Sequence, residues 1–113
     1  MASIYMERTK TYARTKEYVL CTLYDIIELQ KGSLILSDAA RGIVYYKISM
    51  YGYEWELMYT VDDAQRQAGR DPPPDPGQSK GKSNVTLRII GERRENEKEM
   101  RREFALLEAM LNL

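Results

Sequence analysis

The chain has 113 residues, a length that allows one domain with a single hydrophobic core but not two. Its 17 Lys and Arg residues balance 17 Asp and Glu residues, so no net positive charge favours binding to nucleic acid or to an anionic membrane. Histidine is absent and Cys21 is the only cysteine, which removes the commonest general base, the commonest metal ligand and any intramolecular disulfide. We therefore expect no metal and no cofactor.

The amino-terminal part of the chain predicts a strand followed by a helix. Residues 3–9 form the strand, with Ile4 and Met6 as its apolar positions. From about residue 13 to residue 31 apolar residues recur at helical spacing, and one side of this helix carries Val19, Leu20, Leu23, Ile26 and Ile27. Gly32 is expected to end the helix in the left-handed conformation, after a cation in the last turn.

A short strand and a connection precede the most β-rich segment of the chain. Residues 33–37 predict the strand, and residues 38–42 predict the connection. Residues 42–61 then predict a β-hairpin with Tyr51 and Gly52 as a two-residue turn. This hairpin is expected to form the centre of the sheet.

The position of the turn determines which hairpin residues face each other. Lys47 would lie opposite Glu56, and this pairing of opposite charges favours the register. A shift by one residue would turn the apolar side chains of one strand towards the wrong face. The expected pairs on the apolar face are Met50 with Tyr53, Ile48 with Trp55, Tyr46 with Leu57, and Val44 with Tyr59. We expect these aromatic residues to lie in the core or at its edge rather than to stack against bases or sugars.

The segment from about residue 62 to residue 82 contains all four prolines and almost no large apolar residue. It cannot bury enough apolar surface to offset the entropy of ordering it, so we expect a mobile Pro/Gly-rich loop. A polyproline ligand for an aromatic groove is the alternative role of its DPPPDP stretch.

The carboxy-terminal part predicts a last strand and a final helix. Residues 84–90 form the strand, and residues 92–113 form the helix, whose apolar stripe comprises Met100, Phe104, Leu107 and Leu111. Glu103 falls within the apolar sector of this helix. Either Glu103 lies at the margin, where it reaches water or pairs with an arginine, or it lines a cavity between helix and sheet. In the second case burial would raise its pKa.

The order strand, helix, strand, hairpin, strand, helix predicts a single α+β domain. We expect a five-stranded antiparallel sheet with both helices on one face. No helix separates the hairpin from the last strand, which argues against an RNA-recognition motif and against parallel βαβ units. The lone cysteine and the absence of an apolar amino-terminal segment or membrane-spanning run favour a cytoplasmic protein without a membrane partner.

This order resembles the helix-grip and TATA-binding-protein-like β-α-β4-α architecture. The turn Asp38-Ala39-Ala40-Arg41-Gly42-Ile43 is also similar to a D-x-x-x-G-I turn in small bacterial proteins of uncharacterised function. The resemblance implies the same fold over most of the chain. DNA binding by this architecture requires a basic concave surface, which this neutral chain lacks, so that activity is not expected.

Two functions remain open. The first is a non-catalytic module that acts by association, as a homodimer or with a protein partner, through the open face of the sheet. The residues expected in that interface are Ile43, Tyr45, Met58 and Ile90. The second is a carrier of a small apolar ligand between the final helix and the sheet, in a cavity lined by Trp55, Glu103 and Phe104.

An enzyme is not expected, because no pair of nucleophile and base can be assembled without histidine. Cys21 has acidic residues one turn away on either side, and their charge disfavours the thiolate. Glu54 and Glu56 share one strand face, where they are expected to be solvated charges rather than an acid and base pair.

Overall fold

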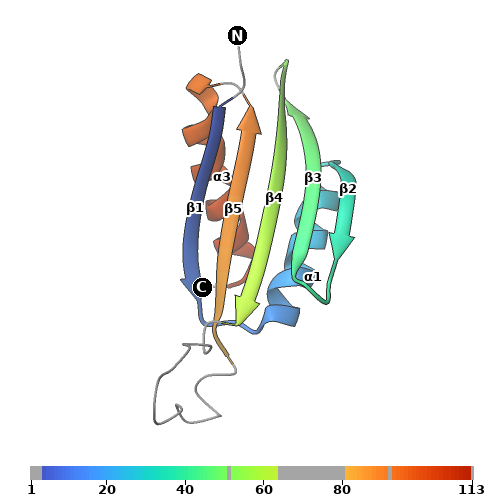
Figure 1. Ribbon diagram of the computed structural model, residues 1–113, viewed down its shortest axis with the longest axis vertical. Helices are drawn as coiled ribbons and strands as arrows, with labels where there is room; N and C mark the ends of the chain where they lie inside the picture. Colours follow the sequence, from blue (N-terminus) through green and yellow to red (C-terminus); the bar gives the residue numbers. More distant parts are fainter. Residues whose placement is uncertain (1–3, 51, 64–80, 92, 113) are drawn as a thin grey trace.

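The computed structural model describes residues 4–50, 52–63, 81–91 and 93–112. Within these residues, five strands form one antiparallel sheet in the order β1-β5-β4-β3-β2, and two helices lie on one of its faces (Figure 1). The strands are β1 (Ile4–Tyr12), β2 (Ser33–Asp38), β3 (Ile43–Met50), β4 (Tyr53–Asp63) and β5 (Ser83–Gly91), and the helices are α1 (Lys16–Leu29) and α3 (Arg93–Met110). The predicted fold class is confirmed, and the elements follow the order β-α-β4-α.

The central hairpin has the predicted register. Ile48 faces Trp55 across β3 and β4, and Lys47 faces Glu56. Gly52 has a φ of 82° in the connection, a conformation that a turn of this kind requires and glycine adopts without strain. β5 pairs with the other side of β4, so β4 is the central strand of the sheet.

β1 and β4 extend further at their carboxyl ends than the sequence predicts. β1 continues to Tyr12, because β5 pairs with it along its whole length. The predicted start of the loop at residue 62 is wrong, since Asp62 and Asp63 belong to β4 and face Asn84 and Ser83 of β5. Backbone pairing on an antiparallel ladder does not require apolar side chains, which is why composition misplaced this boundary. Residues 64–80, including the DPPPDP stretch, lie outside the described residues.

α1 begins and ends at recognisable caps. The Thr15 hydroxyl accepts a hydrogen bond from the N–H of Tyr18 at 3.1 Å, which satisfies one donor of the first turn. At the other end the left-handed residue is Lys31, with a φ of 57°, so the predicted role of Gly32 is wrong. The N–H of Gly32 donates to the carbonyl of Ile27 at 2.8 Å, as in a Schellman motif. Gly32 serves close packing instead, because a Cβ there would lie 3.1 Å from side-chain atoms of β3.

The connection between β2 and β3 explains the D-x-x-x-G-I sequence. Asp38 Oδ1 accepts a hydrogen bond from the N–H of Arg41 at 3.2 Å and closes the turn. Gly42 has a φ of 73°, and a Cβ on it would lie 2.1 Å from the carbonyl oxygen of Val61. The turn therefore requires glycine both for its backbone conformation and for the close approach of β4.

The end of α3 is fastened to the segment between β1 and α1. Arg14 Nε donates to the carbonyl of Leu111 at 3.0 Å, and Arg14 Nη2 donates to the carbonyl of Asn112 at 3.0 Å. These carbonyls follow the last turn of α3, which carries no basic residue of its own. Neither helix in the described part of the chain has the length and apolar character needed to cross a bilayer.

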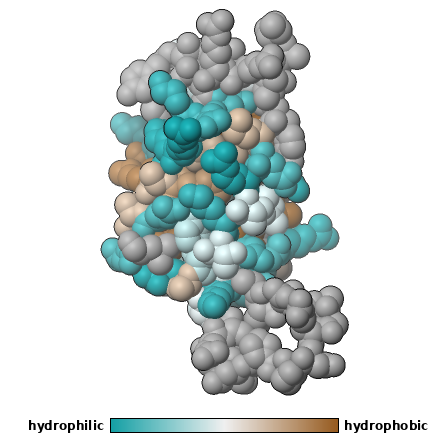
Figure 2. Space-filling model, turned by 90° about the vertical axis from the view of Figure 1, so that its left-hand side faces the viewer, coloured by the Kyte–Doolittle hydropathy of each residue, from teal (hydrophilic) through white to brown (hydrophobic). Residues whose placement is uncertain are grey.

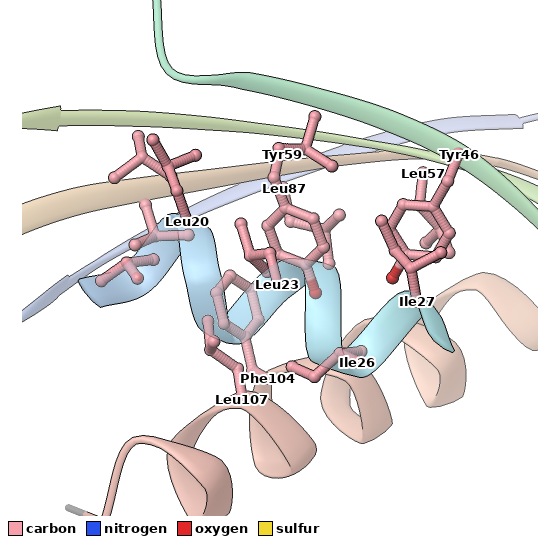
Figure 3. Packing of buried hydrophobic residues seen from close by; sticks show 14 of the residues in the cluster. Leu20, Leu23, Ile26, Ile27, Tyr46, Leu57, Tyr59, Leu87, Phe104 and Leu107 are labelled. Atoms are coloured by element: carbon pink, nitrogen blue, oxygen red, sulfur yellow. The ribbon is translucent and has the colours of Figure 1, made fainter. Parts of the chain in front are cut away.

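The hydrophobic core lies between the helices and the face of the sheet that they cover (Figure 3). Six residues of the apolar hairpin face are buried as predicted, namely Val44, Tyr46, Ile48, Trp55, Leu57 and Tyr59, and Trp55 is 4% exposed. The core comprises Tyr12, Val19, Leu20, Leu23, Ile26, Ile27, Val44, Tyr46, Ile48, Trp55, Leu57, Tyr59, Val61, Val85, Leu87, Ile89, Met100, Phe104, Leu107 and Leu111.

Candidate functional site

Glu103 is buried in the interior, with 0% of its surface exposed. Its Oε1 accepts hydrogen bonds from the hydroxyls of Tyr46, at 2.5 Å, and Tyr59, at 2.8 Å. Its Oε2 lies 3.0 Å from Nη2 of Arg102. Glu103 therefore does not lie at the margin of the helix, although it has the arginine partner that the sequence analysis considered.

The two tyrosines reach Glu103 from neighbouring strands. Their rings are stacked, with centroids 6.2 Å apart and planes 9° from parallel. Figure 3 shows their hydroxyl groups directed from the sheet towards the helices. Burial first, and then the charge of Glu103, raises the pKa of Tyr46 and Tyr59 well above the usual range. Both tyrosines therefore remain neutral, and their hydroxyls donate hydrogen bonds to the carboxylate.

Arg102 connects this carboxylate to a second one. Arg102 Nε donates to Oε1 of Glu99 at 3.0 Å, and Nη2 contacts the other oxygen of the same carboxylate and Oε1 of Gln30. Glu99 is 4% exposed, and its burial raises its pKa against the opposing effect of the Arg102 hydrogen bond. We call the group of Gln30, Tyr46, Tyr59, Glu99, Arg102 and Glu103 the Glu103 cluster.

The contacts of the Glu103 cluster connect α3 to β3, to β4 and to the end of α1. The Glu103 carboxylate accepts hydrogen bonds from both tyrosine hydroxyls, and the Arg102 guanidinium contacts the carboxylates of Glu99 and Glu103. Each charged group therefore has a partner within the cluster. A network of this kind holds elements in place, and it presents no activated nucleophile. Trp55 and Phe104, the other two residues of the predicted cavity, are 4% and 1% exposed. Phe104 extends from α3 towards α1 and the sheet (Figure 3).

The second candidate site lies on the open face of the sheet. The register places Leu36, Tyr45 and Met58 side by side on β2, β3 and β4, so that they form one row across the sheet. Ile43 lies two residues from Tyr45 on the same face of β3. Three of the four predicted interface residues, namely Ile43, Tyr45 and Met58, are therefore neighbours.

Ile90, the fourth predicted interface residue, lies apart from these three. It faces Glu56, which accepts a hydrogen bond from the Tyr45 hydroxyl. Arg88 lies directly opposite Met58, two residues before Ile90 on β5, and forms an ion pair with Glu7 at 3.2 Å. Ile90 is therefore outside the row and only a diagonal neighbour of Met58, with Glu56 and Arg88 as its nearest neighbours on this face.

The most exposed apolar side chains of the sheet were not among the interface residues predicted from the sequence. Leu34, Ile35 and Leu36 of β2 are 50%, 49% and 51% exposed, on an edge strand of the sheet. The missed signal is the lack of polar alternation in the SLILS run, which departs from the pattern of a strand with one buried face. We call Leu34, Ile35, Leu36, Ile43, Tyr45 and Met58 the edge surface.

The remaining candidate residues lie in solvated positions. Glu54 Oε2 is 3.9 Å from Nζ of Lys47, so the ion pair of Lys47 is formed with Glu54 although its backbone faces Glu56. Cys21 is exposed on α1. Among the described residues, no three acidic or cysteine side chains are grouped closely enough to hold a metal ion.

Comparisons with known proteins leave the function open. No protein-family model matches the chain, and no curated protein matches its sequence. Among solved structures, the chain is similar to the crystal structure of Ara h 8.0201, with 8% sequence identity over 97% of this chain and 96% of that chain. The TM-score is 0.45, and a likeness at this level supports no conclusion about what the chain binds.

Proposed function

We propose that this protein is a non-catalytic module that acts by self-association through the edge surface. The observation that carries this proposal is the exposure of Leu34, Ile35 and Leu36, each about half exposed, on the edge strand β2. An edge strand offers unpaired backbone N–H and C=O groups, and apolar side chains on it favour pairing with another chain. The row formed by Tyr45 and Met58 extends the same apolar surface inwards over the open face.

The two edges of the sheet differ in charge, and this difference favours a second copy as the partner. β1 carries Glu7, Arg8 and Lys10, and Figure 2, which views the β1 side of the molecule, shows a largely hydrophilic surface there. Residues 33–37 of β2 carry no charge. Two copies of β2 therefore meet without repulsion, whereas β2 against β1 would bring charges into the contact. Contact between like edges closes into a dimer, while contact between unlike edges would build an open chain.

The expected association is weak. One short edge strand and its neighbouring side chains bury less than the roughly 1,200 Å² at which stable interfaces begin. Interfaces of standard size range from micromolar to picomolar affinity, so we expect a dissociation constant on the order of micromolar or above for this smaller contact. The dimer should therefore depend on concentration in the range that light scattering covers.

The proposal is tested by measuring the mass of the wild type by light scattering from about 10 μM to 1 mM, a range set by the expected affinity. The mass should rise from monomer to dimer. Leu36→Glu should remain monomeric and folded, because it places a charge in the apolar row without touching the core. The matched control is Ile90→Glu, an equal change of charge on the same face, which should dimerise like the wild type. A wild type that stays monomeric throughout would refute the proposal.

The carrier hypothesis is the alternative, and it depends on the interior. Its polar anchor, Glu103, is occupied by two tyrosine hydroxyls and an arginine, so a ligand that used it would have to displace one of them. This occupancy favours association over ligand transport. Uptake of an apolar dye by the wild type, lost in Phe104→Ala, would instead support the carrier.

A further inference from the structure

β2 contains an irregularity that restricts how a second strand can pair with it. Its register against β3 shifts between Leu34 and Leu36, so that Ile35 is an extra residue. Leu34 faces Tyr46, which is buried beneath the helices, whereas Leu36 faces Tyr45 on the open face. Leu34 and Leu36 therefore lie on opposite faces, although two residues of a regular strand at this spacing share one face.

The other positions of β2 follow from the same register. Ser37 faces Val44, and the contact between the hydroxyls of Ser37 and Tyr24 of α1 places Ser37 on the helix-covered face. Ser33 and Asp38 face Lys47 and Ile43, so both lie on the open face. The outer edge of β2 has no described element beyond it (Figure 1).

We propose that β2 pairs antiparallel with β2 of a second copy, with Ser33 opposite the second copy's Asp38, so that two sheets join into one. This inference rests on the proposed self-association and specifies its geometry. The same alignment sets Leu34 opposite the second copy's Ser37 and Ile35 opposite the second copy's Leu36. All six residues of the strand are then paired.

Matching of faces selects this alignment. Residues that oppose each other on an antiparallel ladder must project to the same face of the sheet. Leu34 and Ser37 share the helix-covered face, and Ser33 and Asp38 share the open face, so these two pairs satisfy this condition. Ile35, the extra residue at the register shift, has no partner on β3 that assigns it to a face. An alignment that sets Leu36 opposite the second copy's Leu36 would also set Leu34 opposite the second copy's Asp38. These two residues lie on different faces of the sheet, so this alignment fails. One that centres on Leu34 would leave the second half of β2 unpaired.

The alignment also brings Ile35 and Leu36 of both copies together. The pair of Ile35 with the second copy's Leu36 occurs twice, once on each side of the two-fold axis. Four large apolar side chains, each about half exposed in one copy, therefore adjoin at the centre of the contact. The charged residue Asp38 lies at the ends of the paired segment, where it stays in water and keeps its ion pair with Arg41.

Disulfide formation between differently labelled chains tests the alignment. In a Cys21→Ser background, Ser33→Cys chains are mixed with Asp38→Cys chains, and Leu34→Cys chains with Ser37→Cys chains. Directly opposed residues have Cα atoms about 4.5–5.5 Å apart, which suits a disulfide. Both matched mixtures should form covalent dimers of unlike chains on mild oxidation. Leu34→Cys mixed with Asp38→Cys is the mismatched control and should not, since these residues lie on opposite faces.

The outcomes separate this inference from the proposed function. If the wild type is dimeric but neither matched mixture cross-links above the mismatched control, the copies associate in another way and the edge pairing is wrong, while the proposed self-association stands. A wild type that is monomeric at every concentration would overturn the proposed function itself, and the edge pairing with it.

Discussion

Replacing Glu103 with leucine tests whether the Glu103 cluster stabilises the fold. Leucine has a similar volume, but it leaves the hydroxyls of Tyr46 and Tyr59 without the carboxylate that accepts from both. A buried polar group that loses its partner costs about 1–3 kcal/mol, so the free energy of unfolding should fall by about 2–6 kcal/mol. The loss at Arg102 adds little, because its side chain is 37% exposed and keeps its contacts with Glu99.

The assay is urea denaturation followed by the fluorescence of Trp55, which is the single tryptophan of the chain and lies in the core. The matched control is Glu97→Leu on the same helix. Glu97 is exposed and forms an ion pair with Arg101 at 2.6 Å, one turn away. A pair of this kind contributes only about 0.2–0.5 kcal/mol, so the control should unfold at nearly the urea concentration of the wild type.

The reasoning also predicts a rescue. Combining Glu103→Leu with Tyr46→Phe and Tyr59→Phe removes both orphaned hydroxyls together with their acceptor, so much of the lost stability should return. A single variant that costs less than about 1 kcal/mol would contradict the magnitude. A triple variant no more stable than the single variant would show that the hydroxyls are not the cause.

Two further predictions concern other parts of the fold. Gly91→Ala places a Cβ 2.3 Å from Cδ1 of Trp55 and should lower the free energy of unfolding, measured by urea denaturation, by about 1–3 kcal/mol. The control is Gly81→Ala, whose Cβ would have nothing within 4 Å and which should lower it little. Equal stability of the two variants would refute this prediction. The hydrogen bond from Tyr12, and then Lys10, lowers the pKa of Glu108 from 4.5. The stabilisation by ionised Glu108 is present above about pH 4.5 and is lost as the pH falls through its lowered pKa. The wild type should therefore be more stable than Glu108→Gln at neutral pH, by about a few tenths of a kcal/mol for so exposed a group. This difference should vanish in acid. A difference that does not depend on pH would contradict the role given to Glu108.

The hairpin could be predicted from the sequence because independent constraints agree there. The alternation of apolar residues, the turn at Gly52 and the pairing of Lys47 with Glu56 all specify one register, and a shift would violate each of them. The role of Gly32 could not be predicted in this way. Lys31 takes the left-handed conformation and Gly32 packs against β3, and that packing arises only in the folded chain.

The surroundings of Glu103 also depend on tertiary structure. Helical periodicity places Glu103 in the apolar sector of α3, but its hydrogen-bond donors lie 57 and 44 positions earlier in the chain, at Tyr46 and Tyr59. No local pattern connects residues so far apart. The exposure of Leu34, Ile35 and Leu36 was missed for a related reason, since a short apolar run is equally compatible with a buried strand.

The pairing of β1 has a consequence for the order in which the protein assembles. β1 is synthesised before the other described elements, yet among these its neighbour in the sheet is β5, so that Ile4 lies opposite Gly91. β1 therefore cannot join the sheet until β5 has left the ribosome, and such non-local pairing makes folding slow, on the order of milliseconds to seconds. During that interval the charged residues Glu7, Arg8 and Lys10 disfavour pairing of β1 with strands of other nascent chains.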